Sequence, residues 1–201
     1  AQLNRLDSLF ADSSTGLTAS QDRFFSSLQA VNDDPTSLAA RQLFLAESNN
    51  LAKRFQSIAT ELSRQADTIN GQISITVDKV SSLANEIAAI NKVIIEKGGA
   101  EPGKQANDLL DQRDKLLKEL AALTSISTTD QDNGAVNVFI GSGQAIVLGG
   151  EALQLVSVAS EFDSQKPLLA LQSESSLIKL SNKIGGGVLG GLLEIRDGVM
   201  G

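Results

Sequence analysis

The strongest pattern in the chain is a row of apolar residues spaced three and four positions apart between residues 51 and 94. This spacing places them on one face of an α-helix, and the row is too long for a compact globule of this size to bury, so another helix must cover it lengthwise. Read without a break from about Ser37 to Lys97, the segment predicts one helical rod of about 90 Å at 1.5 Å per residue. Thr76 alone interrupts the row, which consists of Leu51, Phe55, Ile58, Leu62, Ala66, Ile69, Ile73, Val80, Leu83, Ile87, Ile90 and Ile94.

The row contains one change of period. The steps from Ile58 to Leu62 and from Leu62 to Ala66 are both four residues long. Such a stutter locally unwinds a supercoil and turns the apolar face toward a new neighbour. The pattern therefore favours a helical bundle over a two-stranded zipper.

A second long helix is predicted over residues 104 to 123, after a break at residues 98 to 103. A short loop forces this helix to return antiparallel, so we expect it to cover the long row from about Ile73 onward. Shorter amphipathic segments are predicted at residues 3 to 10 and 24 to 31. The apolar face of the second helix carries Leu109, Leu110, Leu116, Leu117, Leu120 and Leu123.

The long helix has two alternative start signals. Asp34 before Pro35 fits a capping carboxylate followed by a first-turn proline, and Ser37 fits an N-cap equally well. Nearby aromatic residues at helical spacing are interpreted as core rather than as an exposed docking patch. They are Phe24, Phe25, Phe44 and Phe55.

From Ser125 the pattern changes from helical to alternating. The turn signal Asp132-Asn133-Gly134 precedes one alternating run, and further short runs predict strands at 145–148, 153–158 and 168–171. The sequence thus predicts an α+β, mainly α fold. Its expected parts are a long-helix antiparallel bundle over residues 1–124, with helices at about 37–97 and 104–123, a small antiparallel β subdomain over 125–184, and a Gly-rich segment over 185–201 that returns toward the helices. The last residues, 197–201, stop where a further helix is expected to begin, which suggests a truncated chain.

Composition limits the chemistry. The 201 residues include no Cys, no His, no Trp and no Tyr, and the formal net charge is -7. Without Cys or His we expect no zinc, haem or iron–sulfur site of the usual kinds and no imidazole-based triad. The negative charge argues against nucleic-acid binding, and no stretch approaches the roughly 20 apolar residues of a membrane span. Catalysis would have to rest on Asp, Glu, Lys and Ser alone, and the composition points to no cofactor and no metal.

Three patterns imitate ligand-binding motifs. Residues 98–104 meet most of the P-loop formula, but Gln105 follows where a hydroxyl is required, and a helix precedes the motif where a strand is needed. Residues 185–190 fit a dinucleotide fingerprint without its acidic partner, so a tight turn is the preferred interpretation. Residues 130–132 open like a calcium loop, but glycines occupy later ligand positions, which favours a hairpin turn.

The charged stretch from Asp108 to Lys115 has two interpretations. Asp111 and Lys115 are four residues apart, which suits a solvated helix face. The alternative is a polar contact between neighbouring subunits, in which Arg113 offers a two-pronged donor to a carboxylate. The candidate subunit-contact residues are Arg41, Asp108, Gln112, Arg113 and Asp114.

Six blocks, in order and spread over nearly the whole chain, resemble one family. Residues 9–17 read LFADSSTGL, and residues 24–29 and 39–42 read FFSSLQ and AARQ. Residues 107–114 (NDLLDQRD) and 136–144 (VNVFIGSGQ) follow, with GGVLGGLLEIRD at 186–197. Together they resemble the N-terminal part of bacterial flagellar hook-associated proteins of the FlgK type.

The resemblance implies a non-catalytic junction protein in the bacterial flagellum, outside the cell. Members form a ring between hook and filament, contact the hook protein and the FlgL-type junction protein, and leave the cell unfolded through the flagellar type III apparatus, with an export chaperone as a further partner. It also implies a core fragment that lacks the terminal helices. Two alternatives stay open. They are another secreted coiled-coil protein of a type III apparatus (a needle-tip protein or translocator) and a nucleotide-dependent enzyme.

Overall fold

The fold is α+β and mainly helical, as predicted, with one very long helix and two small antiparallel sheets. It divides into two compact units, Ala1–Gln65 and Ala66–Gly201, and the division falls within the long helix. The expected opening helix at residues 3–10 and the expected break at 98–103 lie outside the described residues. The computed structural model describes residues 16–97, 104–161, 163, 166–173, 176–180 and 184–200.

The long helix, α3, spans Leu38–Glu96, within one residue of the predicted range at each end. Its start uses both predicted signals in different ways. The Ser37 hydroxyl accepts a hydrogen bond from the amide of Ala40 (3.2 Å), which is the N-cap contact, whereas the Asp34 carboxylate accepts from the amide (3.1 Å) and the hydroxyl (2.8 Å) of Thr36. Ser37 thus caps the helix, and Asp34 shapes the turn that precedes it.

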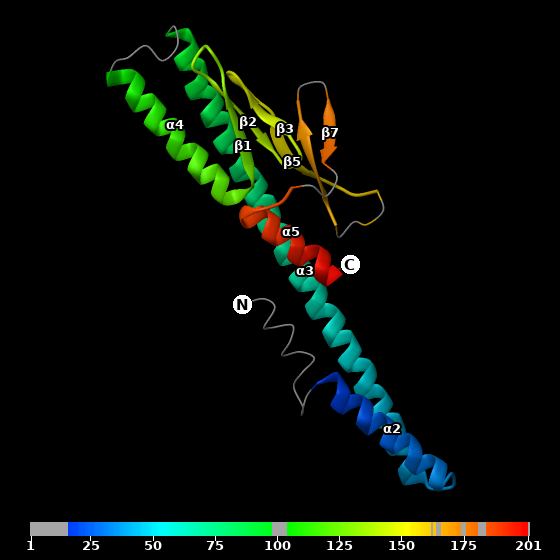
Figure 1. Cartoon of the computed structure of the whole chain (residues 1–201). Coiled ribbons are helices and arrows are strands. Elements are labelled where there is room, and N and C mark those ends of the chain that lie inside the picture. Colours follow the sequence, from blue (N-terminus) through cyan, green and yellow to red (C-terminus); the bar gives the residue numbers. More distant parts are fainter. Residues whose placement is uncertain are drawn as a thin grey trace. The chain divides into compact units, whose positions relative to one another are not determined.

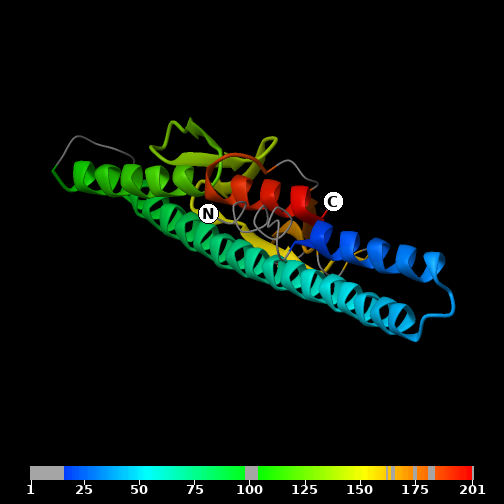
Figure 2. The same ribbon diagram turned by 90° about the horizontal axis from the view of Figure 1, so that it is seen from below.

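In the first unit, α2 (Leu17–Asp33) pairs with the first part of α3. The two helices run side by side and antiparallel, joined by residues 34–37 (Figure 2). Phe24 of α2 contacts Phe44 of α3, with ring centroids 5.4 Å apart, and Phe24 also meets Phe25 edge to face at 5.3 Å. The contact between Phe24 and Phe44 joins the two helices.

In the second unit, α4 (Lys104–Leu123) runs antiparallel beside the last part of α3, as predicted (Figure 1). Leu116 and Leu120 of α4 are buried in the same apolar cluster as the α3 residues from Ile69 to Ile94. The cluster includes the predicted row over this range, and Thr76, which interrupts the row, is also buried and bonds the carbonyl of Gln72 (2.7 Å). Turning its hydroxyl back onto its own helix lets Thr76 fit an apolar face.

The first sheet contains four antiparallel strands in the order of the sequence. Within β2 the buried and half-buried residues alternate, as expected for a strand with one face on the core. The turn before β2 forms at the predicted residues 132–134, where Gly134 has φ 80°. The strands are β1 (Ile126–Asp130), β2 (Val136–Ile140), β3 (Gln144–Leu148) and β4 (Glu151–Ala152).

The second sheet contains three antiparallel strands in the order β5–β6–β7. The central strand is buried at three consecutive residues, Leu169, Ala170 and Leu171, which fits a strand covered on both faces. Sequence patterns predicted β5 and β6 but not the edge strand β7, nor β1 and β4 in the other sheet. The strands are β5 (Gln154–Val158), β6 (Leu168–Gln172) and β7 (Leu177–Leu180).

Within the Gly-rich segment predicted at 185–201, residues Gly187–Met200 form a helix, α5, that the sequence pattern did not predict. Glycine at the start of α5 allows its backbone to lie close to the end of α4. Gly187 has φ +60°, and a Cβ there would lie 2.5 Å from the Leu123 carbonyl carbon and 2.6 Å from the Thr124 nitrogen. Only glycine permits this contact between the start of α5 and the end of α4. The predicted tight turn at 185–190 is therefore a turn followed directly by a helix.

The boundary predicted between residues 124 and 125 falls inside the second unit. The physical reason is a shared core, since buried residues of α3, α4, both sheets and α5 form one apolar cluster. The change from helical to alternating pattern marks a change of secondary structure there. It does not mark the edge of a separate hydrophobic core.

Candidate functional site

The paired helices of the first unit leave much of their apolar surface uncovered. Of the apolar side chains described in residues 16–65, only Ile58 is buried. Phe25 is 62% exposed and Phe55 is 48% exposed, so the interpretation of these two as core is wrong for the single chain. Among the described residues 16–65 there are two helices, and a third neighbour would be needed to bury both apolar stripes. The exposed large apolar residues are Phe25 and Leu28 of α2 and Leu38, Leu43, Leu45 and Phe55 of α3.

A shallow groove of about 390 Å³ runs over these two helices. The small side chains of Ser26 and Ser27 on α2 leave it open, and Leu43 on α3 gives it an apolar wall. Arg23 and Glu47 face each other there, with Nε and Oε2 3.9 Å apart. The groove thus combines an apolar wall with one exposed ion pair, as helix-packing surfaces often do.

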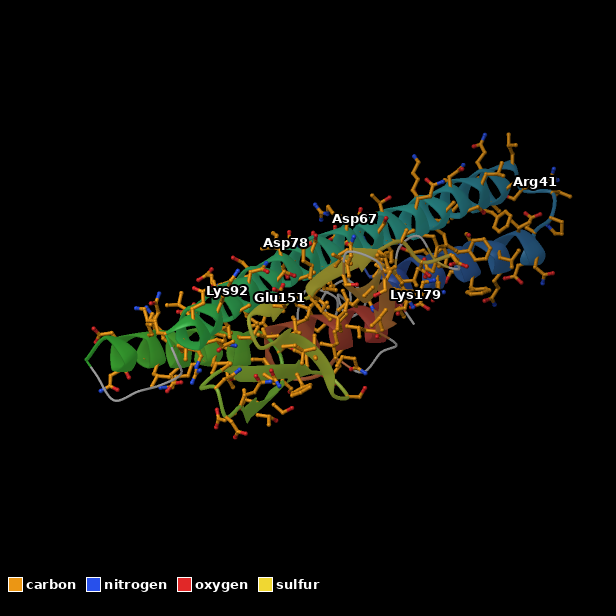
Figure 3. All side chains as sticks on the ribbon, turned by 90° about the horizontal axis from the view of Figure 1, so that it is seen from above. Arg41, Asp67, Asp78, Lys92, Glu151 and Lys179 are labelled. Atoms are coloured by element: carbon orange, nitrogen blue, oxygen red, sulfur yellow. The ribbon has the colours of Figure 1, made fainter. Side chains whose placement is uncertain are left out.

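Four of the five predicted contact residues are exposed. Arg41 lies in the first turn of α3 (labelled in Figure 3), and its guanidinium donates to the carbonyl of Pro35 through Nε (2.9 Å) and through a terminal nitrogen (2.5 Å). Asp108, Gln112 and Asp114 lie exposed on α4. Arg41 belongs to the first unit and the three α4 residues to the second, and the contact role of all four stays a prediction.

Arg113, the fifth, is buried and only 8% exposed. One terminal nitrogen of its guanidinium donates to the carbonyl of Gly134 at 2.8 Å and approaches Oδ1 of Asn91 at 3.5 Å, while its Nε has no hydrogen-bond partner among the described residues. The predicted two-pronged contact with another subunit is corrected accordingly. Arg113 instead joins α4 to the β1–β2 turn, because its side chain points into the chain's own core.

Asn91 of α3 is fully buried and joins the helix to the first sheet. Its Nδ2 donates to the carbonyls of Val136 (2.7 Å) and Gly149 (2.8 Å), and its Oδ1 accepts from the amide of Val136 (3.2 Å). The amide of Gln131 bonds the carbonyl of Ala135 toward β1, so the groups of Val136 point to the opposite side of β2. Asn91 therefore takes the place of a neighbouring strand at this position.

Ser81, ten residues earlier on α3, does the same for the second sheet. Its hydroxyl accepts from the amide of Leu155 at 2.9 Å and donates to the carbonyl of the same residue at 2.8 Å. Leu155 lies on β5, an edge strand of the sheet. The helix thus satisfies edge groups that would otherwise be unpaired.

A second buried arginine lies on α5. Arg196 is 5% exposed, and its guanidinium donates to Oδ1 of Asp197 (3.0 Å) and to the carbonyl of Pro167 (2.8 Å). It lines a cavity of about 40 Å³ with Leu168 and Leu193. That volume is on the scale of single water molecules rather than of a cofactor.

No group of three or more metal-binding side chains occurs among the described residues. The P-loop-like residues 98–103 lie outside the described part of the chain, whereas the calcium-loop candidate at 130–132 leads into the β1–β2 turn. The dinucleotide-like glycines contact the chain's own backbone, since a Cβ on Gly190 would lie 2.8 Å from the carbonyl carbon of Gly185. No described helix is both long and apolar enough to cross a membrane.

Two exposed carboxyl groups have lowered pKa values. The hydroxyl of Thr36, and then its amide, lower the pKa of Asp34 by hydrogen bonding to the ionised carboxylate. The hydrogen bond and positive charge of Lys179, whose Nζ lies 3.0 Å from Oε1, lower the pKa of Glu161. Both groups lie in or beside turns, where they stabilise local geometry.

In the second unit, α3 supports the two sheets β1–β4 and β5–β7, which together form the β lobe. In the first unit it exposes apolar residues, which is typical of a surface that contacts another protein. A family model described as the flagellar hook-associated protein FlgK helical domain matches residues 3–201. The chain belongs to this family of flagellar hook-associated proteins.

Named relatives agree with this assignment. The chain is 34% identical over 198 residues to flagellar hook-associated protein 1 of Salmonella typhimurium and 31% identical over 198 residues to that of Escherichia coli. Each match covers 98% of this chain and 36% of the relative. The chain therefore spans about a third of the length of these relatives.

A solved structure has the same fold. The flagellar hook junction protein FlgK from Burkholderia pseudomallei matches with a TM-score of 0.85 and 27% identity, over 96% of this chain and 35% of that one. The likeness covers both the helices and the β lobe. The resemblance inferred from six short sequence blocks is thus confirmed at the level of the whole domain.

Sequence reasoning missed Ser81 and Asn91 as contact residues. Asn91 replaces an apolar residue on a face that carries Ile87, Ile90 and Ile94, and this polar interruption was an available signal. Ser81 lies beside the apolar row and gives no such signal. The motif at 107–114 did lead to Arg113 as a candidate, although its hydrogen bond to Gly134 reaches a turn more than twenty residues away.

Proposed function

We propose that the chain is the helical domain of a structural protein at the junction between flagellar hook and filament. The observation that carries the proposal is the uncovered apolar surface of α2 and the first part of α3. Exposed aliphatic and aromatic residues in this number mark a surface that another protein covers. The family supports the same role, because the solved relative is described as a hook junction protein.

In this proposal the covering surface is supplied by neighbouring subunits in a ring. The hook protein and a FlgL-type junction protein would adjoin the ring on its two sides, and an export chaperone would accompany the chain before assembly. The site of action is the flagellum, outside the cell. The chain contributes shape and packing surface to the junction and no catalytic step.

The polar contacts of the proposed interface are Arg41, Asp108, Gln112 and Asp114. All four are exposed, and both charge signs are present, which suits contacts at the rim of an interface. Arg113 is excluded from this set because the chain's own turn occupies its donor.

The genetic experiment uses the full-length protein in its own bacterium. A variant with Phe25→Ser, Leu43→Ser and Phe55→Ser should leave cells with hooks but few filaments and with reduced swimming. The control carries Gln29→Ser, Gln42→Ser and Gln56→Ser, which change exposed polar residues of the same helices. Normal filaments in the first strain, with the variant protein present at normal levels, would contradict the proposal.

A second strain tests the polar contacts. Gln112→Ala with Asp114→Ala changes two exposed residues on α4 and leaves the buried Arg113 in place. We expect weaker filament attachment, measured as filaments shed under shear. Lys118→Ala, at an exposed position one turn further along α4, serves as the control.

A further inference from the structure

The contact between α3 and the two sheets is built mainly from apolar residues. Buried Val, Ile, Leu and Ala side chains recur at every turn of α3 from Ile69 to Ile94. Apolar burial has little directionality, and apolar side chains recur along the helix. Apolar packing alone would therefore allow the β lobe to sit one helical turn higher or lower on α3 at small loss.

Two hydrogen-bonded contacts, one for each sheet, distinguish the observed position of the β lobe from the shifted ones. Ser81 bonds both backbone groups of Leu155, and Asn91 bonds both backbone groups of Val136. They are ten residues apart, or about 15 Å along the helix axis at 1.5 Å per residue. Two contacts at different heights on α3 determine the position of the β lobe, whereas one contact alone would allow the lobe to rotate about it.

A shift of one turn in either direction would remove the Asn91 contact, and a shift in one of the two directions would also put an apolar residue in the place of Ser81. Moving the lobe by four residues would bring Ile87 or Ile95 to the place of Asn91, and Val77 or Asn85 to the place of Ser81. An isoleucine side chain offers no hydrogen bond to the Val136 peptide groups, which would be left buried and unpaired. The loss of the Asn91 hydrogen bonds is therefore the main reason why the shifted arrangement is disfavoured.

A close steric contact lies beside Asn91. A Cβ on Gly150 would lie 3.2 Å from Cβ of Lys92 and 3.5 Å from its Cα, so the β3–β4 turn rests directly on α3. Asn91 also bonds the carbonyl of the preceding Gly149. The turn therefore meets the helix at one defined height.

We infer that Ser81 and Asn91 act as two polar pins that fix the height of the β lobe on α3. Without the pins the lobe would still pack on the helix, but in more than one register. Buried polar groups fix the register of helices in coiled coils by the same principle. The inference concerns the domain itself and does not depend on the proposed function.

The absence of cysteine makes a distance measurement direct. Spin labels on Asp78→Cys and Ser142→Cys, both exposed positions, report the distance between α3 and the first sheet by pulsed electron resonance. The pin variant is Asn91→Leu with Ser81→Ala. The matched control is Asn85→Leu with Ser82→Ala, which changes exposed residues of the same types on the same helix.

The parent and the control should each give one narrow distance distribution. The pin variant should give a broader distribution with a second population, displaced by up to about 5 Å for a shift of one helical turn. A single distribution in the pin variant, identical to that of the control, would overturn the inference.

If the pin variant loses helicity, the single variant Ser81→Ala is tested instead. Its spin labels are on Asp78→Cys in α3 and on Gln172→Cys in the second sheet. This variant keeps Asn91. Supporting results are a broadened distance distribution and amide exchange at Leu155 that is about tenfold faster than in Ser82→Ala. An unchanged distance distribution would overturn the inference.

Discussion

The carboxamide of Asn91 and the peptide groups of Val136 bond in both directions, with Nδ2 donating to the carbonyl at 2.7 Å and the backbone amide donating to Oδ1 at 3.2 Å. This is the pair of bonds that a neighbouring strand makes in an antiparallel ladder. A helix side chain thus completes the ladder of β2. The β lobe is attached to α3 by hydrogen bonds as well as by apolar packing.

Asn91→Ala should lower the free energy of unfolding by about 2–4 kcal/mol, because it leaves three backbone groups of Val136 and Gly149 buried without partners. Urea unfolding followed by circular dichroism measures the loss. Asn85→Ala, at an exposed position of the same helix, should change the stability by less than about 0.5 kcal/mol. Equal stability of the two variants would contradict the assigned role of Asn91.

Arg113→Met should lower the free energy of unfolding by about 1–2 kcal/mol, less than Asn91→Ala. Methionine keeps much of the packing of the arginine stem. The loss is modest because the guanidinium makes its close hydrogen bond to a neutral carbonyl, and because its Nε has no hydrogen-bond partner among the described residues. Asp114→Ala, next to it in sequence but exposed, should leave urea unfolding nearly unchanged. A larger loss of stability in Asp114→Ala than in Arg113→Met would contradict the buried role of Arg113 and support the surface role predicted from sequence.

Gly187→Ala should destabilise the domain by about 2–4 kcal/mol, since it combines a positive φ with overlap against the backbone of Leu123 and Thr124. Gly191→Ala lies on the same helix with no atom within 4 Å of the added Cβ. It should stabilise the domain by up to about 1 kcal/mol through helix propensity. Thermal unfolding of both variants checks the contrast, and equal melting temperatures would refute the assigned close contact.

Thr36→Val should raise the pKa of Asp34 toward its ordinary value, because the largest cause of its lowered pKa is the hydrogen bond from the Thr36 hydroxyl. A folded-state pKa below the unfolded value stabilises the fold above the unfolded pKa, and this contribution is lost as pH falls through the folded pKa. NMR titration of the Asp34 carboxyl carbon measures the shift. Thr60→Val, which removes a hydroxyl bonded only to the carbonyl of Gln56, should leave that pKa unchanged.

The sequence predicted the parts of the fold that depend on local periodicity. The three- and four-residue spacing gave α3 to within one residue at each end, and Asp132-Asn133-Gly134 gave the first hairpin turn. Helix α5 escaped prediction because its glycines are poor helix formers. Glycine is needed at Gly187 because the start of α5 lies against the end of α4. The local spacing of apolar residues does not reveal such a contact.

The candidate site was predicted less completely. Helical spacing identified the apolar residues of α2 and α3 but not which of them the chain itself covers, since Phe24 is half-buried and Phe25 beside it is exposed. Arg113 was predicted as a contact residue, yet its side chain is buried and bonds a turn far along the sequence. Exposure and long-range hydrogen bonds follow from tertiary packing, which spacing alone does not specify.

The most direct test of the assembly role is the chemical accessibility of Leu43→Cys, in the exposed groove of the first unit, within the full-length protein. The rate of maleimide labelling is compared between the purified monomer and isolated flagella that retain hook and filament. We predict rapid labelling in the monomer and at least about tenfold slower labelling in the flagella, because a neighbouring subunit covers an exposed apolar surface of this kind. Equal labelling rates in the two states would contradict the account.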